Sequence, residues 1–237
     1  MAGKQFFITG TSSGIGRALA EECLERGYKV VGISRRKRID HPNYVHLSYN
    51  LANYQDYHLI NFDRNRQADE LVLVNNAGWL GEVKPLGQIN PQSIARLFQI
   101  NLIAPSILSR LFIEQTKPSQ GRRSIINISS GAARYPVASW SNYCSSKAGL
   151  EMMTRVMALD HPDIRFWSIS PGVVDTEMQG EIRKLEEDDF PEVDRFIGYK
   201  EKGELTNPDE VAYKLLDILS NPEKAPDIVL SLRDYQL

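Results

Sequence analysis

The residues of this chain best suited to chemistry are Ser130, Tyr143 and Lys147, which lie within one short stretch of sequence. Tyr143 and Lys147 are four residues apart, a spacing that places both side chains on one face of a helix. A phenol held beside an ammonium group donates a proton near neutral pH more readily than a free phenol, whose pKa is about 10. With a hydride donor opposite these groups, the protein would reduce carbonyls or oxidise alcohols.

A glycine-rich loop near the start of the chain is a candidate phosphate site. It contains Gly10, Gly14 and Gly16, with Ser12, Ser13 and Ile15 between them. Glycines let the backbone turn tightly and approach a pyrophosphate, which the N-terminus of the following helix then stabilises. A merely flexible turn is the alternative, and the spacing TGxxxGxG differs from the common GxGxxG. The position of the loop between a predicted strand and a predicted helix favours phosphate binding.

The end of the second predicted strand indicates which dinucleotide would bind. NAD-specific sites place Asp or Glu there to hold the ribose 2′-hydroxyl. This chain has Ser34, Arg35 and Arg36 instead, and guanidinium groups bind a 2′-phosphate well. A solvated basic loop is the alternative, because Lys37 and Arg38 follow directly. We predict NADP(H) as the cofactor, with Arg35 as the main contact and Arg36 as its neighbour.

The bulk composition is that of an ordinary soluble globular protein, with 42% hydrophobic and 24% charged residues in 237. A formal net charge of −2 argues against nucleic acid as a main partner. No apolar run approaches the roughly 18 residues that a membrane span needs, and the early apolar run QFFIT leaves no room for a signal peptide. The two cysteines and four histidines have no metal-ligand spacing, so we expect a cytoplasmic protein without a metal site.

Short apolar runs alternate with longer amphipathic segments along the chain. The predicted strands are residues 4–9, 28–33, 44–48, 70–74, 123–128, 164–169 and 227–230. The predicted helices are residues 14–26, 54–66, 91–116, 141–160 and 208–220. This alternation predicts a single-domain, doubly wound, Rossmann-like α/β fold over residues 1–237, with about seven parallel strands and helices on both faces.

Two local features depart from this regular pattern. Pro105 has no N–H to donate to the carbonyl of Asn101, so the helix should kink and leave that carbonyl free, for example to bind a water. Residues 175–206 fit neither the helix nor the strand period. Such an insertion is either an active-site lid or a solvated surface loop, and the two are equally compatible with the sequence.

The chain resembles the short-chain dehydrogenase/reductase family over nearly its whole length. The resemblance rests on TGxxxGxG at residues 9–16, NNAG at 75–78, NLIAP from Asn101, Ser130, Tyr143-x-x-x-Lys147 and PGVVDT at 171–176. Within the family, the stretches around Tyr143 and after residue 170 are most similar to the sepiapterin reductase and benzil reductase group.

The resemblance implies a catalytic tetrad of Asn101, Ser130, Tyr143 and Lys147. Tyr143 would transfer the proton and Ser130 would polarise the substrate carbonyl. Lys147 would hold the nicotinamide ribose and lower the pKa of Tyr143, and a water on the Asn101 carbonyl would connect Lys147 to solvent. The other implied cofactor contacts are Asn50 and Leu51 near the adenine, Asn76, Ala77 and Gly78 along the adenosine, and Pro171, Gly172, Val174 and Thr176 near the nicotinamide and pyrophosphate.

These features together predict an NADPH-dependent carbonyl reductase, acting on a ketone beside a second carbonyl or on a pterin side-chain ketone. The alternatives are an NADP-dependent alcohol dehydrogenase working oxidatively and a non-catalytic regulator that senses NADP(H). Four further residues, Trp79, Tyr135, Trp140 and Met178, would form an apolar wall for the substrate or simply pack in the core. The helix after Tyr143 is apolar on more than one side, which in this family indicates a homodimer or homotetramer.

Overall fold

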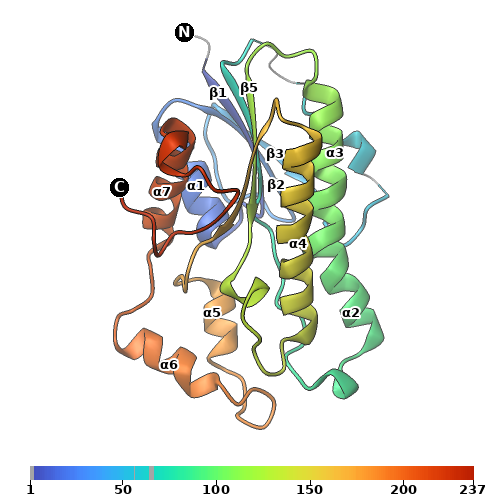
Figure 1. The fold of residues 1–237 in the computed structure, drawn as a ribbon, viewed down its shortest axis with the longest axis vertical. Coiled ribbons are helices and arrows are strands. Elements are labelled where there is room, and N and C mark those ends of the chain that lie inside the picture. The colour runs from blue at the N-terminus through green and yellow to red at the C-terminus, as the bar shows by residue number, and fades with distance from the viewer. Residues whose placement is uncertain (1–2, 56, 64–66) are drawn as a thin grey trace.

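The computed structural model describes residues 3–55, 57–63 and 67–237, and a seven-stranded parallel sheet forms its centre (Figure 1). The strand order is β3-β2-β1-β4-β5-β6-β7. The strands are β1 (Lys4–Thr9), β2 (Lys29–Ser34), β3 (Tyr44–Ser48), β4 (Glu70–Asn75), β5 (Arg122–Ile128), β6 (Arg165–Ser170) and β7 (Val229–Ser231). The predicted fold class and all seven predicted strands are confirmed. The order reverses between β1 and β4, and ligands of such sheets bind at the carboxyl ends of the strands beside that reversal.

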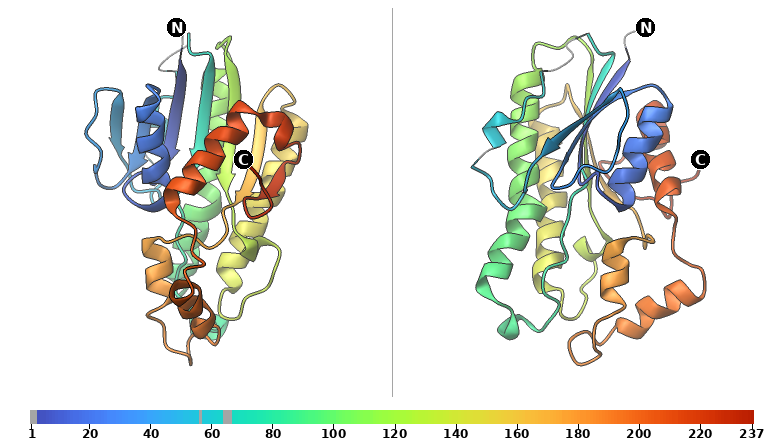
Figure 2. Two further views of the ribbon diagram at one scale, coloured as in Figure 1. Left: turned by 90° about the vertical axis from the view of Figure 1, so that its left-hand side faces the viewer. Right: turned by 180° about the vertical axis from the view of Figure 1, so that it is seen from behind.

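Helices cover both faces of the sheet (Figures 1 and 2). One face carries α1 (Gly14–Glu25) and α7 (Pro208–Ser220), and the other carries α3 (Ala104–Thr116) and α4 (Ser141–Asp160). Side chains of a strand alternate between faces, so Phe6 and Ile8 of β1 join the core under α1 and α7, whereas Phe7 joins the core under α3. All three are fully buried, as both faces of a covered parallel sheet require.

The helix predicted over 91–116 forms in three continuous parts. They are α2 (Pro91–Phe98), a π-helical segment η3 (Gln99–Ile103) and α3. The N–H of Ala104 bonds to the carbonyl of Gln99, five residues back, directly before Pro105. The missing N–H of the proline is therefore accommodated by a widened turn.

By length and composition alone, the continuous helix Pro91–Thr116 could cross a membrane, with a mean hydropathy of 1.2. Ala104, Leu108 and Phe112 of this helix are fully buried against the sheet. We therefore interpret it as a core helix of this fold.

The helix predicted over residues 54–66 is wrong for the residues described there. They contain only a single 3-10 turn, η1 (Tyr57–Leu59), and positions 56 and 64–66 lie outside the described residues. The side-chain oxygens of Asn53 and Asn61 accept hydrogen bonds from backbone N–H groups two residues ahead, which competes with helix formation. Tyr57, Ile60 and Phe62 are instead buried in the core under α3, so the segment is held by its large apolar side chains.

Residues 175–206 fold into two short helices, α5 (Glu177–Ile182) and α6 (Val193–Glu201), below the carboxyl ends of the strands (Figure 1). A β-bridge between Val174 and Thr206 closes the base of this excursion. Ile182, Phe190 and Val193 are buried within it, so the segment is a small packed unit rather than a solvated loop. Its action as a lid stays a prediction. The remaining short 3-10 turns are η2 (Leu86–Gln88), η4 (Gly131–Ala133) and η5 (Pro222–Lys224).

Candidate active site

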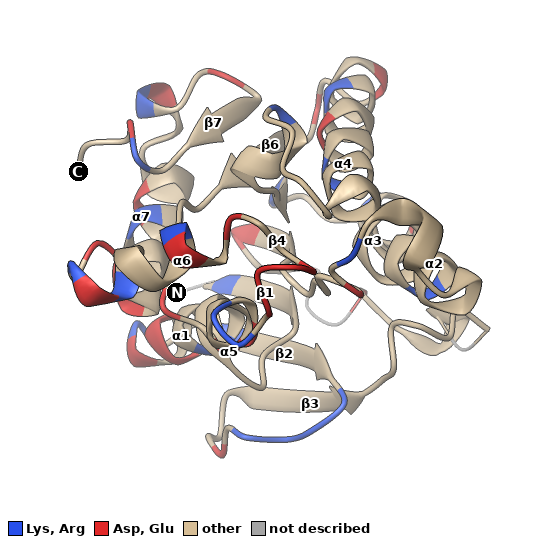
Figure 3. Cartoon of the chain, turned by 90° about the horizontal axis from the view of Figure 1, so that it is seen from below, with Lys and Arg blue, Asp and Glu red and all other residues tan. Residues whose placement is uncertain are grey.

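A cavity of about 920 Å³ lies at the carboxyl ends of the strands, bounded below by residues of α5 and α6. Figure 3 views the molecule from this side. The cavity collects nearly all the site residues predicted from the sequence: Gly10, Ser12, Ser13, Gly14, Ile15, Arg35, Arg36, Asn50, Leu51, Asn76, Ala77, Gly78, Ser130, Tyr143, Lys147, Pro171, Gly172, Val174 and Thr176. Gly16 and Asn101 are the two predicted residues that do not line it.

Tyr143 and Lys147 lie one turn apart on α4, and both are almost fully buried. The Lys147 Nζ donates a hydrogen bond of 2.8 Å to the carbonyl of Ile128, at the end of β5. The same nitrogen lies 5.8 Å from the centre of the Tyr143 ring. The sheet thus holds the lysine, and the helix places the phenol beside it.

The acid–base behaviour of this pair differs from the sequence-based expectation. Burial raises the pKa of Tyr143 to about 12, and a hydrogen bond from Ser130 offsets part of that rise. Burial also lowers the pKa of Lys147 to about 8. The pKa of Tyr143 is therefore raised rather than lowered, because desolvation of the phenolate outweighs every stabilising contact in the protein itself. Tyr143 is a protonated phenol at neutral pH, which is the form that a proton donor needs.

Ser130 follows β5 and caps the 3-10 turn η4. Its Oγ accepts a hydrogen bond of 3.2 Å from the N–H of Ala132, which fixes the hydroxyl at the cavity wall. Ser129 is buried, and its Oγ has no partner among the described residues. Ser130 is thus the serine whose hydroxyl reaches the phenol of Tyr143.

Asn101 lies behind the cavity in the π-helical segment, fully buried. Its Oδ1 accepts from the N–H of Trp79 at 2.8 Å, and its Nδ2 donates to the Trp79 carbonyl at 2.8 Å and to Ser146 Oγ at 3.2 Å. The side chain therefore ties α4 to the chain after β4. A Cβ on Gly78 would lie 3.5 Å from Lys147 Nζ and 3.8 Å from Asn101 Oδ1. Gly78, Lys147 and Asn101 therefore lie close together.

The glycine loop is well suited to an anion. Ser13 is the N-cap of α1, but its side chain makes no capping hydrogen bond, and the first turn of α1 contains no acidic residue. The first N–H groups of α1 therefore retain bonding capacity toward a phosphate. Gly16 has a packing role instead, since a Cβ there would lie 2.3 Å from Asn76 Nδ2 and 2.5 Å from the Gly10 carbonyl.

The basic segment after β2 lies at another edge of the cavity, in the loop beside β3 (Figure 3). Arg35 and Arg36 are exposed, and neither forms an ion pair with any described residue, whereas Lys37 pairs with Asp40 at 2.9 Å. Two uncompensated guanidinium groups beside a glycine loop fit a ribose that carries a 2′-phosphate.

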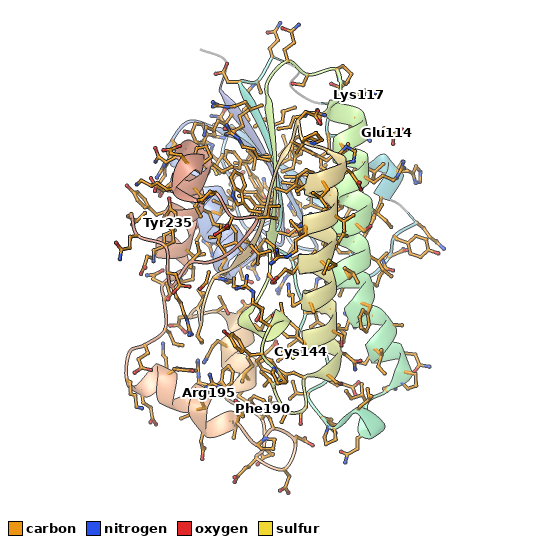
Figure 4. All side chains as sticks on the ribbon, viewed as in Figure 1. Glu114, Lys117, Cys144, Phe190, Arg195 and Tyr235 are labelled. Atoms are coloured by element: carbon orange, nitrogen blue, oxygen red, sulfur yellow. The ribbon has the colours of Figure 1, made fainter. Side chains whose placement is uncertain are left out.

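An aromatic cluster packs beside Tyr143, and two of its members, Trp140 and Phe196, line the cavity. Trp140 stacks on Phe190 with ring centres 5.4 Å apart and meets the Tyr143 ring edge-on at 5.4 Å. Phe196 of α6 packs on both Trp140 and Phe190 at 5.5 Å. Figure 4 shows Phe190 and Cys144 on facing elements at this end of the molecule. All four predicted wall residues, Trp79, Tyr135, Trp140 and Met178, line the cavity.

Sequence reasoning missed several residues of the cavity wall. They include Arg96, Arg195, Phe196, Tyr199 and Arg233. Arg195, Phe196 and Tyr199 lie on α6 at spacings of three and four residues, and this periodicity is the local signal that could have found them. Arg96 and Arg233 are brought to the site by the fold alone.

Comparisons with known proteins agree with this geometry. The profile of the short chain dehydrogenase family matches residues 4–187. This chain belongs to the short chain dehydrogenase family. One relative is a benzil reductase ((S)-benzoin forming) of Bacillus subtilis, which is 38% identical over 90% of this chain and 92% of that protein. A sepiapterin reductase of Xenopus tropicalis is 34% identical over 64% of this chain and 59% of that protein.

Solved structures share the fold of this chain. The KRED1-Pglu enzyme superposes with a TM-score of 0.79 at 28% identity, over 91% of this chain and 94% of that one. A 4-hydroxyisoleucine dehydrogenase complexed with NADH has a TM-score of 0.76 at 22% identity, over 95% of each chain. The protein is therefore an oxidoreductase of this family, acting at carbonyl or alcohol groups with a nicotinamide cofactor.

Proposed function

We propose that this protein is an NADPH-dependent carbonyl reductase. The observation that carries the proposal is one cavity that joins three features. These are the Ser130–Tyr143–Lys147 group, the N-terminus of α1 without a side-chain cap, and Arg35 and Arg36, which form no ion pair with a described residue. The first group would transfer the proton, the helix N-terminus would bind the pyrophosphate, and the arginines would bind the 2′-phosphate. Bound NADPH supplies the hydride that reduces the carbonyl carbon.

The protein's own groups handle the substrate oxygen. Ser130 donates a hydrogen bond to the carbonyl oxygen and so stabilises the charge that develops there. Tyr143 donates its phenolic proton to the same oxygen as the alcohol forms. Lys147, anchored on the Ile128 carbonyl, holds a positive charge near that phenol and offers its remaining N–H groups to ribose hydroxyls. Asn101 positions α4 and the segment around Trp79.

Tyr143 has a pKa raised to about 12 by burial, so in the protein itself it is the protonated phenol that reduction needs. The same residues would serve the oxidation of an alcohol in reverse. The proposed direction follows from the NADPH preference, because the cellular pool of this cofactor is mostly reduced.

The substrate class follows from the cavity wall. Trp140 and Phe196 line the cavity beside Tyr143, and the buried Phe190 supports the Trp140 ring by stacking on it, which suits a ketone that carries an aromatic ring. Two relatives are named as reductases of ring-bearing carbonyl compounds, benzil and sepiapterin, which supports this class. We propose aromatic α-dicarbonyls as the preferred class, with a pterin side-chain ketone as the second candidate.

A panel assay tests this proposal. Purified protein is given NADPH or NADH with benzil, 1-phenyl-1,2-propanedione, sepiapterin, xylulose or 2,3-butanedione, and absorbance at the nicotinamide band is followed. We expect the highest kcat/KM with NADPH and an aromatic diketone. Equal rates for aromatic and small aliphatic diketones would contradict the substrate class, and absence of turnover on the whole panel would favour the non-catalytic regulator.

We further propose a cytoplasmic homo-oligomer that associates through α4. Leu150 and Thr154 are buried against the sheet, while Met152, Val156 and Leu159 on the outer face are 61%, 47% and 80% exposed. These three share a helical face, and they form an apolar stripe of the kind that a second subunit covers.

A further inference from the structure

We infer that Tyr44, Thr11 and Ser34 form a positioning device for the arginine segment, and that this device sets the preference for a 2′-phosphate. The inference rests on the proposed NADPH function. The three residues form a buried chain of hydroxyl groups. Tyr44 lies at the start of β3, Ser34 at the end of β2, and Thr11 directly after β1.

The chain of hydroxyls has consecutive short contacts. Tyr44 OH lies 2.9 Å from Thr11 Oγ1, which donates to Ser34 Oγ at 3.4 Å. Ser34 Oγ donates in turn to the carbonyl of Arg36 at 3.0 Å. The three side chains are 8%, 1% and 6% exposed, respectively, so water does not compete freely for these bonds.

The direction of the proton donation is fixed by counting hydrogens. Each hydroxyl has one proton to donate. The proton of Ser34 goes to the Arg36 carbonyl and the proton of Thr11 goes to Ser34, which leaves Tyr44 as the donor to Thr11. All donation therefore runs toward the arginine segment, and removal of any member leaves the next hydroxyl without its partner. The Tyr44 hydroxyl also lies 3.5 Å from His46 Nδ1, a longer contact.

The fold makes room for this contact at one strand position. Tyr44 on β3 reaches across β2 to Thr11, which follows β1, and the residue crossed is Gly32. A Cβ on Gly32 would lie 2.0 Å from Tyr44 OH and 2.6 Å from Thr11 Oγ1. A glycine inside a buried strand otherwise weakens it, and here it admits the close approach of two side chains.

The hydroxyl chain connects the two ends of the proposed dinucleotide site, which are the glycine loop and the arginine segment. Thr11 belongs to the glycine loop, and Arg36 belongs to the basic segment, so the hydroxyl chain fixes the loop relative to the arginines. Arg35 and Arg36 are exposed and make no ion pair with a described residue, and the Arg36 carbonyl is held by Ser34 at 3.0 Å, while a longer contact of 3.5 Å joins Ser48 Oγ to the Arg35 carbonyl. A ligand with a 2′-phosphate gains from that restraint, and a ligand without one does not.

The test measures binding rather than turnover. The dissociation constants of 2′,5′-ADP and 5′-ADP are measured by titration calorimetry for wild type, Tyr44→Phe, Thr11→Val and Ser34→Ala. We expect each variant to bind 2′,5′-ADP about three- to tenfold more weakly, as loss of one buried hydrogen bond implies, with 5′-ADP binding unchanged. Thr11→Ser, which keeps the hydroxyl, should restore the preference.

A matched control removes an equally buried threonine hydroxyl far from the site. Thr116 is 1% exposed, and its Oγ1 donates to the Phe112 carbonyl at 2.6 Å. It lies at the end of α3 marked by Glu114 and Lys117 in Figure 4, opposite Phe190. Thr116→Val should alter the melting temperature without changing the ratio of the two dissociation constants.

The outcomes separate this inference from the proposed function. If wild type binds both nucleotides equally, the NADPH preference itself is wrong. If wild type discriminates and all three variants discriminate equally well, or lose affinity for both ligands in parallel, the positioning role is wrong. Should Tyr44→Phe fail to fold, Ser34→Ala decides alone, because it removes a single oxygen atom.

Discussion

At the scale of single residues, burial controls the chemistry of this site. Tyr143 and Lys147 are both shielded from water, and desolvation shifts their pKa values in opposite directions, to about 12 and about 8. Each shift favours the neutral form of its group. The phenol therefore keeps its proton for donation, while the ammonium titrates close to physiological pH.

Removal of the phenolic hydroxyl tests the proton donor. Tyr143→Phe should lower kcat for the diketone by at least about a hundredfold, because the substrate oxygen then lacks its positioned acid. Binding of NADPH, followed by quenching of tryptophan fluorescence, should persist. Turnover close to that of wild type would show that another group donates the proton.

The pH dependence of kcat/KM for NADPH reports ionisations of the free enzyme. Lys147 is protonated below its pKa of about 8 and neutral above it, so kcat/KM should fall as pH rises through about 8. Tyr143 stays protonated throughout, because its pKa is about 12. In Lys147→Arg the charge persists to high pH, and the falling limb near pH 8 should vanish. A limb that survives in this variant would belong to a different group.

Arg35 tests the cofactor preference at the residue level. Arg35→Ala should raise KM for NADPH roughly tenfold or more, because a charge-assisted hydrogen bond to phosphate is lost. KM for NADH should hardly change. Equal increases for both cofactors would mean that the segment is a solvated basic loop. The exposed Arg38, replaced in the same way, is the matched control.

At the scale of elements, the site depends on where strands end and helices begin. Strand β5 places Ser130 and the Ile128 carbonyl, and α4 places Tyr143 and Lys147 against them. The excursion α5–α6 adds Phe190 and Phe196 to the aromatic cluster. Cofactor contacts and substrate contacts thus come from different elements, and variants should be able to separate them.

Phe190 provides that separation. Phe190→Ala removes the ring stacked on Trp140, so KM for an aromatic diketone should rise about three- to tenfold. KM for NADPH should stay constant, because the glycine loop and the arginine segment are untouched. Phe190→Leu, which keeps most of the buried apolar volume, is the control for packing. A parallel rise of both KM values would show that α5–α6 supports the whole cavity.

At the scale of the whole molecule, the outer face of α4 is the surface that a second subunit would cover. Met152→Lys combined with Leu159→Glu places charges where two exposed apolar side chains stand, 61% and 80% exposed. Light scattering after gel filtration should give a multiple of 26.9 kDa for wild type and about that single mass for the variant. An unchanged mass in the variant would exclude α4 as the interface.

The sequence by itself predicted the fold class, the seven strands and a set of site residues of which all but Gly16 and Asn101 line the cavity. These features are local or short in range: apolar runs, a glycine loop, and a Tyr–Lys pair one helical turn apart. Residues 54–66 were misread as a helix because the burial of Tyr57, Ile60 and Phe62 depends on partners distant in sequence.

Only the tertiary structure decided three further points. The pKa of Tyr143 depends on how completely the surrounding elements exclude water, which no spacing reveals. The aromatic cluster depends on the return of α6 toward α4. The contact of Tyr44 with Thr11 across Gly32 joins residues on or next to three different strands. Chemistry carried by one segment can be read from its residue types, whereas desolvation and contacts between segments arise only when the chain has folded.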